Sequence, residues 1–278
     1  MVNKRKKERL TARAFLISSI AMFSLFLILI ILVKTVDVKE VGPNGSKIGF
    51  ASFNNFLFES LGKNKFWYNF TKVFGIVSIL IAVGFVGYGV YDIIKKRNIK
   101  NMKSDILAMG IVFVLLVLVY LFFEIVKVNF RPVLIDGKLE ASFPSSHTML
   151  CLTIFGVATM FACGRLKNVW VKGTCIIGLS LVAILVSIGR IFAGVHWFTD
   201  VLGAILISTC LVLLYGYLCI FLKKYLVSAN ERFNEGEEIA DDEDDENDDD
   251  DNDDSDEDED DEDEDENYGD DGDEDVDE

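Results

Sequence analysis

The sequence has few of the residues that most often bind transition metals, with only two histidines and five cysteines among 278 residues. No histidines or cysteines occur at the short spacings typical of a zinc site. All five cysteines lie inside long hydrophobic runs, where a buried thiol usually serves in packing. The sequence therefore predicts no metal site and no other cofactor.

Basic residues are absent from the end of the chain. Residues 241–278 contain 30 Asp and Glu residues and no Lys or Arg, although the whole chain has a formal net charge of −17. The other residues combine only 14 acidic side chains with all 27 basic ones. Like-charge repulsion and the lack of apolar residues predict a disordered acidic tail over residues 231–278. This tail is expected to be solvated or, alternatively, to bind cations or basic proteins weakly. No nucleic-acid partner is expected.

The rest of the sequence contains hydrophobic runs that are too long for helices of a soluble protein. A bilayer core about 30 Å thick needs roughly 20 apolar residues per helix. We therefore predict an all-α, polytopic membrane protein with about six transmembrane helices in a bundle (residues 14–230), preceded by a basic segment (residues 1–13). The predicted spans are residues 14–33, 73–91, 106–123, 148–164, 174–189 and 201–222.

The positions of Lys and Arg predict the orientation of these spans. Basic clusters precede the first span, separate the second from the third and the fourth from the fifth, and follow the sixth. Six crossings place all of these clusters on one side, which the positive-inside rule makes the cytoplasmic side. Both termini are then cytoplasmic. No small-residue cleavage site follows Val33, so the first span is expected to be an uncleaved anchor.

The predicted outer loop after the first span is rich in aromatic residues. Its earlier members, from Phe50 to Leu61, are spaced three or four apart, and a cluster of aromatic residues follows over residues 66–70. This pattern predicts an amphipathic helix lying in the outer membrane interface. The helix is expected to act as an anchor leading into the second span or, alternatively, to border an entrance for a lipid substrate.

Both histidines lie at the outer ends of predicted spans, next to other polar residues. Three segments contain them and their neighbours, namely residues 127–132, 144–147 and 189–200. Alternating crossings place these three segments on the same face, the extracytoplasmic one. Ionisable residues at a membrane boundary are costly, so such a convergence indicates a functional site.

The residue types in these segments fit phosphate. Arg131 and Arg190 carry planar guanidinium groups suited to bidentate contacts with phosphate oxygens. Ser145 and Ser146 lie at the predicted start of a helix, where free backbone amides attract anions.

The two histidines fit a nucleophile and an acid. His196 and Asp200 are four residues apart, and a carboxylate at this spacing can keep one imidazole nitrogen protonated while the other is free to attack. His147 then remains as an acid for the leaving oxygen.

These segments resemble the type-2 phosphatidic acid phosphatase family, which is related to bacterial acid phosphatases and vanadium haloperoxidases. The family has three motifs, K-x6-R-P, P-S-G-H and S-R-x5-H-x3-D. Arg131-Pro132 matches the end of the first motif. Pro144-Ser145-Ser146-His147 matches the second, with Ser146 in place of glycine. The third is matched by Arg190, His196 and Asp200, with Gly189 in place of serine. The resemblance covers roughly residues 106–222.

The resemblance implies a role for each matching residue. His196 would be the nucleophile that forms a phosphohistidine, Asp200 would orient it, and His147 would protonate the leaving group. The phosphoryl oxygens would be held by Arg131, Ser145 and Arg190.

The first motif departs from the family pattern. Its lysine position is occupied by Glu124. Lys127, one helical turn later, could contact the same phosphate from another angle, and an unpaired carboxylate beside a phosphate would be repulsive.

The predicted function is therefore a phosphohydrolase of membrane lipid phosphates or pyrophosphates, in a bacterial plasma membrane. Undecaprenyl pyrophosphate, phosphatidylglycerophosphate and phosphatidic acid are candidate substrates, and an outward-facing site favours polyprenyl pyrophosphate. A lipid phosphotransferase and a catalytically silent lipid-phosphate-binding protein are alternatives. Intact His147, His196 and Asp200 argue against the silent protein.

Overall fold

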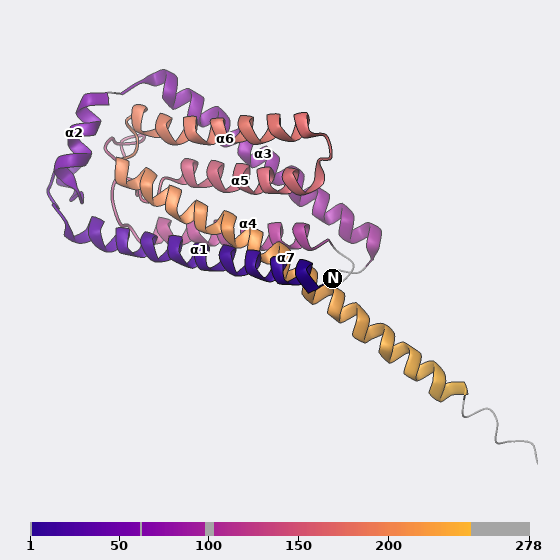
Figure 1. The fold of residues 1–278 in the computed structure, drawn as a ribbon. Helices are drawn as coiled ribbons and strands as arrows, with labels where there is room; N and C mark the ends of the chain where they lie inside the picture. The colour runs from indigo at the N-terminus through magenta and orange to yellow at the C-terminus, as the bar shows by residue number, and fades with distance from the viewer. Residues whose placement is uncertain (1, 62, 98–102, 246–278) are drawn as a thin grey trace, which may run out of the picture. The chain divides into compact units, whose positions relative to one another are not determined.

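The computed structural model describes residues 2–61, 63–97 and 103–245, and the chain divides into two units, residues 1–231 and 232–278. The described residues form seven α-helices and one short 3-10 helix, η1 (Pro43–Gly45). Figure 1 shows the long helices of the first unit lying side by side. The α-helices are α1 (Val2–Thr35), α2 (Ala51–Leu61), α3 (Lys65–Lys96), α4 (Ser104–Ile125), α5 (Ser146–Arg165), α6 (Val169–Phe192) and α7 (Phe198–Asp245).

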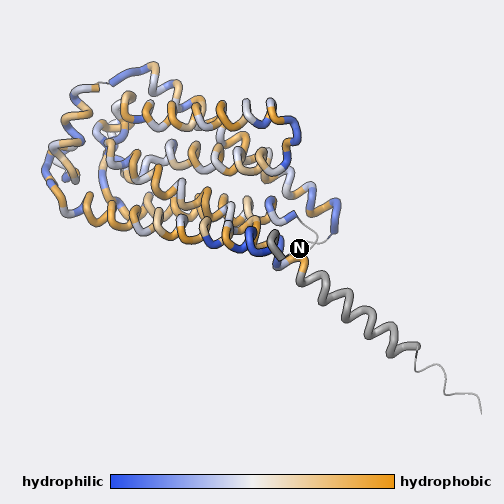
Figure 2. Tube along the Cα trace, in the orientation of Figure 1, coloured by the Kyte–Doolittle hydropathy of each residue, from blue (hydrophilic) through white to orange (hydrophobic). Residues whose placement is uncertain are grey.

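Six of these helices are long and apolar enough to cross a bilayer. They are α1 and α3 to α7, and each contains one of the hydrophobic runs recognised in the sequence. Figure 2 shows hydrophobic residues along these helices, with hydrophilic residues gathered toward their ends and in the connections. The prediction of an all-α integral membrane protein is confirmed, and the six long apolar helices are its candidate spans.

Helix α2 occupies part of the aromatic segment that follows the first span. Its bounds agree with the amphipathic helix expected from the spacing of the earlier aromatic residues. The later aromatic cluster belongs instead to the first turns of α3. That helix begins where the Asn64 side chain accepts hydrogen bonds from the amides of Phe66 and Trp67. An Asn in this position satisfies amides that the helix itself leaves without acceptors.

The core of the first unit lies around α5, which packs against α3, α4 and α6. Large side chains such as Phe155 and Val157 of α5 and Val186 of α6 are fully or almost fully buried there. At the end of α5 the guanidinium of Arg165 forms a bidentate pair with Asp105 in the first turn of α4. The five cysteines are unpaired and are buried or half-buried within spans.

The acidic tail was predicted to be disordered from residue 231 onward. Helix α7 instead continues to Asp245, so the first part of this segment is helical in the structure. Extending an existing helix avoids the unfavourable nucleation step, and glutamate is a good helix former. Residues 246–278 lie outside the described part of the chain.

Candidate active site

The three polar segments recognised in the sequence meet at one end of the bundle. They are the loop between α4 and α5, the first turn of α5, and the short connection between α6 and α7. Backbone hydrogen bonds join them, because the amide of Ser145 donates to the carbonyl of Asp200 at 3.0 Å and that of Ser142 donates to Asn129 at 3.0 Å. The start of α5 is therefore fixed against the start of α7.

His196 lies between α6 and α7 and is almost completely buried. Its Nδ1 is 3.0 Å from the carbonyl oxygen of Ser142, and its Nε2 is 3.4 Å from Nη1 of Arg131. A carbonyl can only accept a hydrogen bond and a guanidinium can only donate one. Nδ1 therefore carries the proton, and the lone pair of the ring lies on Nε2, which is the nitrogen free to act as a nucleophile.

Asp200 lies beside the same imidazole but has other hydrogen-bond partners. Its Oδ2 is 3.7 Å from Nδ1 of His196, beyond hydrogen-bond distance, and accepts from the amide of Trp197 at 2.9 Å. Its Oδ1 accepts from the side chain of Asn129 at 3.4 Å. Asp200 thus holds the turn that presents His196, whereas the Ser142 carbonyl is the nearer partner of the ring.

The surroundings of His196 favour a neutral ring. Burial lowers the pKa of His196 well below its usual value of 6.5, and the positive charges of Arg190 and Arg131 lower it further. A ring that stays unprotonated at neutral pH keeps the lone pair on Nε2 available.

The positive charges of Arg131 and Arg190 both act on this imidazole, and the two arginines have different partners. The Nε of Arg131 is 3.1 Å from a carboxylate oxygen of Glu140. Arg190 is only 2% exposed and donates through Nη1 to the Thr71 hydroxyl of α3 at 3.3 Å. Its Nε has no hydrogen-bond partner, and in the described part of the chain no carboxylate pairs with it. A buried charge of this kind is costly unless an anion accompanies it.

His147 lies in the first turn of α5 and packs against α3. Gly75 of α3 makes room for it, since a Cβ at that position would be 2.8 Å from Cδ2 of the imidazole. The charges of Arg190, Arg131 and Lys72 all act on this ring. The two histidines and the two arginines therefore share one electrostatic environment.

The serines at the start of α5 differ in their surroundings. Ser145 is completely buried, and its hydroxyl donates to Thr148 at 3.1 Å. Ser146 is half-buried and lines a small cavity. The first amides of a helix have no acceptors within it, so the start of α5 offers donors to an anion.

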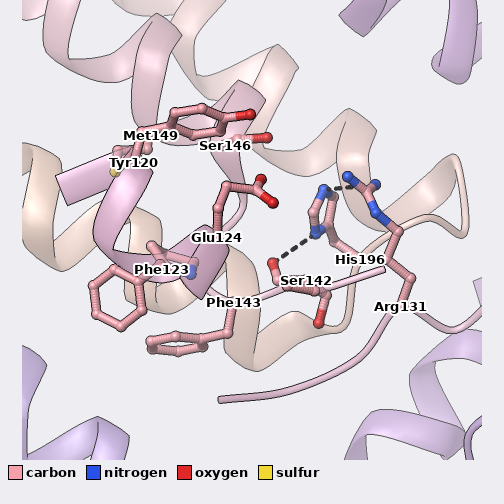
Figure 3. A pocket seen from close by; sticks show the side chains of 11 residues that line it. Tyr120, Phe123, Glu124, Arg131, Ser142, Phe143, Ser146, Met149 and His196 are labelled. Atoms are coloured by element: carbon pink, nitrogen blue, oxygen red, sulfur yellow. Dashed lines mark hydrogen bonds between the residues drawn. The ribbon is translucent and has the colours of Figure 1, made fainter. Parts of the chain in front are cut away.

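The cavity beside His196 has a volume of about 20 Å³, room for little more than one water molecule. In Figure 3 the imidazole of His196 lies between the carboxylate of Glu124 and the guanidinium of Arg131. Lys127 is exposed and is not among the residues that line the cavity. A phosphoryl group can approach Nε2 only when the Arg131 guanidinium moves aside. The lining residues are Tyr120, Phe123, Glu124, Arg131, Ala141, Ser142, Phe143, Pro144, Ser146, Met149 and His196.

Several residues that build the site were not identified from the sequence. Asn129 joins Asp200 to the loop before α2, since its Oδ1 also accepts from the amide of Gly49 at 3.4 Å. On α2, the Asn54 side chain donates to the hydroxyl of Thr199 at 2.9 Å and accepts from the amide of Thr199 at 3.3 Å. Asn129 is buried in the loop after α4, and Asn54 is buried on α2. A buried side-chain amide needs hydrogen-bond partners, so an asparagine in a segment expected to pack is the sequence feature that could have indicated them.

The close approach of α3 and α6 explains the glycine at position 189. A Cβ on Gly189 would be 2.8 Å from side-chain atoms of both Thr71 and Trp67. The serine of the family motif would not fit here without movement of α3. Trp67 also stacks on Phe192 with ring centroids 5.7 Å apart, which keeps the two helices together beside Arg190.

Comparison with known families shows which part of the chain resembles characterised proteins. Residues 111–222, about two-fifths of the chain, match the family model described as the PAP2 superfamily. All of the predicted site residues, from Lys127 to Asp200, lie inside the matched segment, whereas Thr71 and Gly75 lie outside it.

Two comparisons find similarity to proteins of Bacillus subtilis. It is 31% identical over 113 residues to phosphatidylglycerophosphatase B of strain 168, covering 40% of this chain and 51% of that protein. The chain thus spans about half the length of this curated relative. The fold resembles a crystal structure described as the first transmembrane PAP2-type phosphatidylglycerolphosphate phosphatase from that species. The TM-score is 0.51 at 22% identity, and the match covers 75% of this chain and 95% of the other.

The described residues contain no group of three or more His, Cys, Asp and Glu side chains that could hold a metal ion.

Proposed function

We propose that this chain is a membrane lipid phosphatase that acts through a phosphohistidine on His196. The observation that carries the proposal is a neutral, buried imidazole whose free nitrogen is 3.4 Å from Arg131 and whose ring also feels the charge of Arg190. One of these, Arg190, is buried without a carboxylate partner among the described residues. A buried arginine without a carboxylate partner, close to a nucleophile, suits an anionic substrate. The similarity of residues 111–222 to the PAP2 superfamily supports phosphate as that anion.

In the first step Nε2 of His196 attacks phosphorus and the P–N bond forms. The bond from phosphorus to the leaving oxygen breaks, and its electron pair goes to that oxygen, which takes a proton from His147. The ring of His147 is charged at this stage because the negative phosphate bound beside it offsets the nearby arginines. Arg131, released from Nε2, donates to a phosphoryl oxygen together with Arg190 and the amides at the start of α5. Arg190 and the amides of α5 are already in place before the reaction, so their positive charge stabilises the transition state without further movement, whereas Arg131 must first leave Nε2.

In the second step a water molecule attacks the phosphorus of the phosphohistidine. His147, now neutral, takes a proton from this water, the P–N bond breaks and its electrons return to Nε2. Inorganic phosphate leaves and both histidines regain their starting protonation states. Ser142 and Asp200 keep the imidazole in place through both steps, because one holds Nδ1 and the other holds the turn.

A lipid substrate suits the position of the site. The cavity lies where α4, α5 and α7 reach one end of the bundle, so a headgroup can enter while the acyl or prenyl chain stays among the spans. Similarity to phosphatidylglycerophosphatase B makes phosphatidylglycerophosphate one candidate. Phosphatidic acid and undecaprenyl pyrophosphate are the others. The positions of Lys and Arg support an extracytoplasmic site with both termini in the cytoplasm.

The test is phosphate release by the purified full-length protein from a panel of lipid phosphates, with and without EDTA. We expect metal-independent release and its loss in His196→Ala. Transfer of phosphate to an added alcohol in preference to water would indicate a phosphotransferase. Absence of release from every lipid, or release that EDTA abolishes, would contradict the proposal.

A further inference from the structure

Glu124 occupies the position of a cationic residue in the first PAP2 motif, and it faces the reacting groups. It lies in the last turn of α4 and lines the same cavity as His196, Arg131 and Ser146. In Figure 3 its carboxylate points toward the imidazole from the side opposite Arg131. Any group attached to a phosphate that contacts His196 and Arg131 meets this carboxylate if it enters the cavity.

Neither nearby cation neutralises Glu124. Arg131 pairs with Glu140, and the exposed Lys127 does not line the cavity. Within the described ranges no Lys or Arg forms an ion pair with Glu124. Its neighbour is the phenol of Tyr120, one helical turn earlier, which interacts with its carboxylate and also lines the cavity. A phenol can donate one hydrogen bond but cannot cancel the charge.

The cavity therefore has positive charge on one side of His196, from Arg131, and negative charge on the other, from Glu124. The reacting phosphoryl group lies among Arg131, Arg190 and the amides of α5, where negative charge is favoured. A second phosphoryl group that reaches the Glu124 side of the cavity would meet a like charge, so negative charge is disfavoured there. An ester oxygen followed by a neutral glycerol unit carries no charge and meets no such repulsion.

We propose that Glu124 is a specificity-determining residue that selects lipid phosphate monoesters against lipid diphosphates. This inference rests on the proposed phosphatase function and deepens it. With a monoester the leaving group is a neutral alcohol after protonation by His147. With a diphosphate the leaving group is a lipid monophosphate, and its negative charge lies beside Glu124. A preference for monoesters disfavours polyprenyl pyrophosphate, which is the substrate that an outward-facing site alone would suggest.

The test compares two lipids that differ by one phosphoryl group, phosphatidic acid and diacylglycerol pyrophosphate, in mixed micelles with the full-length protein. The measured quantity is the ratio of kcat/KM for the diphosphate to that for the monoester. Glu124→Gln should raise this ratio roughly tenfold or more, because a like charge a few ångströms away is removed. Glu124→Lys should raise it further.

Glu59→Gln is the matched control, since Glu59 is exposed like Glu124 but lies on α2 and does not line the cavity. Its ratio should stay within about twofold of the wild type, as expected for a screened surface charge. Equal ratios in the wild type, Glu124→Gln and Glu59→Gln, with phosphatidic acid still hydrolysed, would overturn the inference and leave the phosphatase function standing.

A binding measurement separates the two proposals if no lipid is hydrolysed. Thermal stabilisation of the wild type, Glu124→Gln and Glu59→Gln is measured with inorganic phosphate and with pyrophosphate, because an anion that binds the folded state raises the melting temperature. Glu124→Gln should gain stabilisation by pyrophosphate more than by phosphate. An identical response of all three proteins to both anions would refute the role of Glu124 independently of turnover.

Discussion

The two ring nitrogens of His196 have different partners, and this difference determines what each substitution at the site should do. Nδ1 is held by a backbone carbonyl, which no side-chain substitution removes, and Nε2 is covered by Arg131. Asp200 braces the turn through the amide of Trp197 and the side chain of Asn129. Loss of Asp200 should therefore act through the position of the ring more than through its tautomer.

Replacement of the two histidines should produce losses of different kinds. His196→Ala should remove turnover almost completely, because the proposed attack on phosphorus depends on its Nε2. His147→Ala should cost roughly 10² to 10⁴ in rate, the usual contribution of a general acid. That loss should shrink for an aryl phosphate, whose leaving group needs little proton transfer. Rates of both variants across a series of aryl phosphates provide the measurement, and an equal dependence on leaving-group acidity would refute the division of roles.

The acid side of the pH profile should depend on the charge of Arg131. His196 must be neutral to attack, and its pKa lies well below 6.5 because of burial and the two arginines. Arg131→Gln removes one positive charge, so the pKa of His196 should rise and kcat/KM should fall off at a higher pH than in the wild type. Arg131→Lys keeps the charge and should leave the acid limb in place.

Profiles of kcat/KM against pH with one substrate isolate this effect, since the ionisation of the substrate is the same for every variant. An acid limb of Arg131→Gln that stays in place, or moves to lower pH, would show that the charge of Arg131 does not act on His196.

At the scale of helices, α3 forms a wall of the site although it lies outside the segment matched by the family. Gly75→Ala should place a methyl group 2.8 Å from Cδ2 of His147 and push the acid out of line. We expect a loss of about tenfold or more for substrates with poor leaving groups, part of what removing the acid costs, and a smaller loss for aryl phosphates.

Gly84→Ala is the control for this change. It lies on the same helix, and a Cβ there has no atom within 4 Å. Its activity should equal that of the wild type, while its stability should rise slightly, as expected for alanine in a helix interior. Equal losses in both variants would show that Gly75→Ala acts on α3 as a whole and not on His147.

The sequence predicts the elements better than it predicts the contacts between them. Long hydrophobic runs are a local signal, and the six spans follow from it. The three motifs predict which side chains carry charge and hydrogen-bonding groups at the site. The roles of Thr71 and Gly75 depend on the packing of α3 against α5 and α6, which no local pattern in α3 indicates. The carbonyl of Ser142 belongs to the backbone and has no signal in residue type.

At the scale of the whole molecule, the side of the membrane on which the site lies is the property to be tested. Lys138→Cys places a thiol on the exposed loop between α4 and α5, near the site, and Lys103→Cys places one at the start of α4, the opposite end. An impermeant maleimide should label the first variant in intact cells and the second only after lysis. The native cysteines lie within spans, so the parent protein gives the background. The reverse pattern would place the site in the cytoplasm.

Helix α2 is attached to the start of α7, so the turnover rate should depend on whether the protein is in a lipid bilayer or in detergent. The Asn54 side chain donates a hydrogen bond to Thr199 and accepts one from it. The ring centroids of Phe53 and Phe198 are 5.4 Å apart. Phe56, on the same helix, is 64% exposed. A lipid nanodisc supplies a flat interface into which the apolar face of such a helix can insert, which holds the helix in place, and a detergent micelle does not. Asn54→Ala should therefore lower kcat several-fold more in micelles than in nanodiscs, whereas Asn55→Ala, next to it and half-buried, should behave alike in both. An equal loss in the two environments would show that α2 holds the His196 turn through its hydrogen bonds alone, and detergent would then be a faithful medium for assaying this protein.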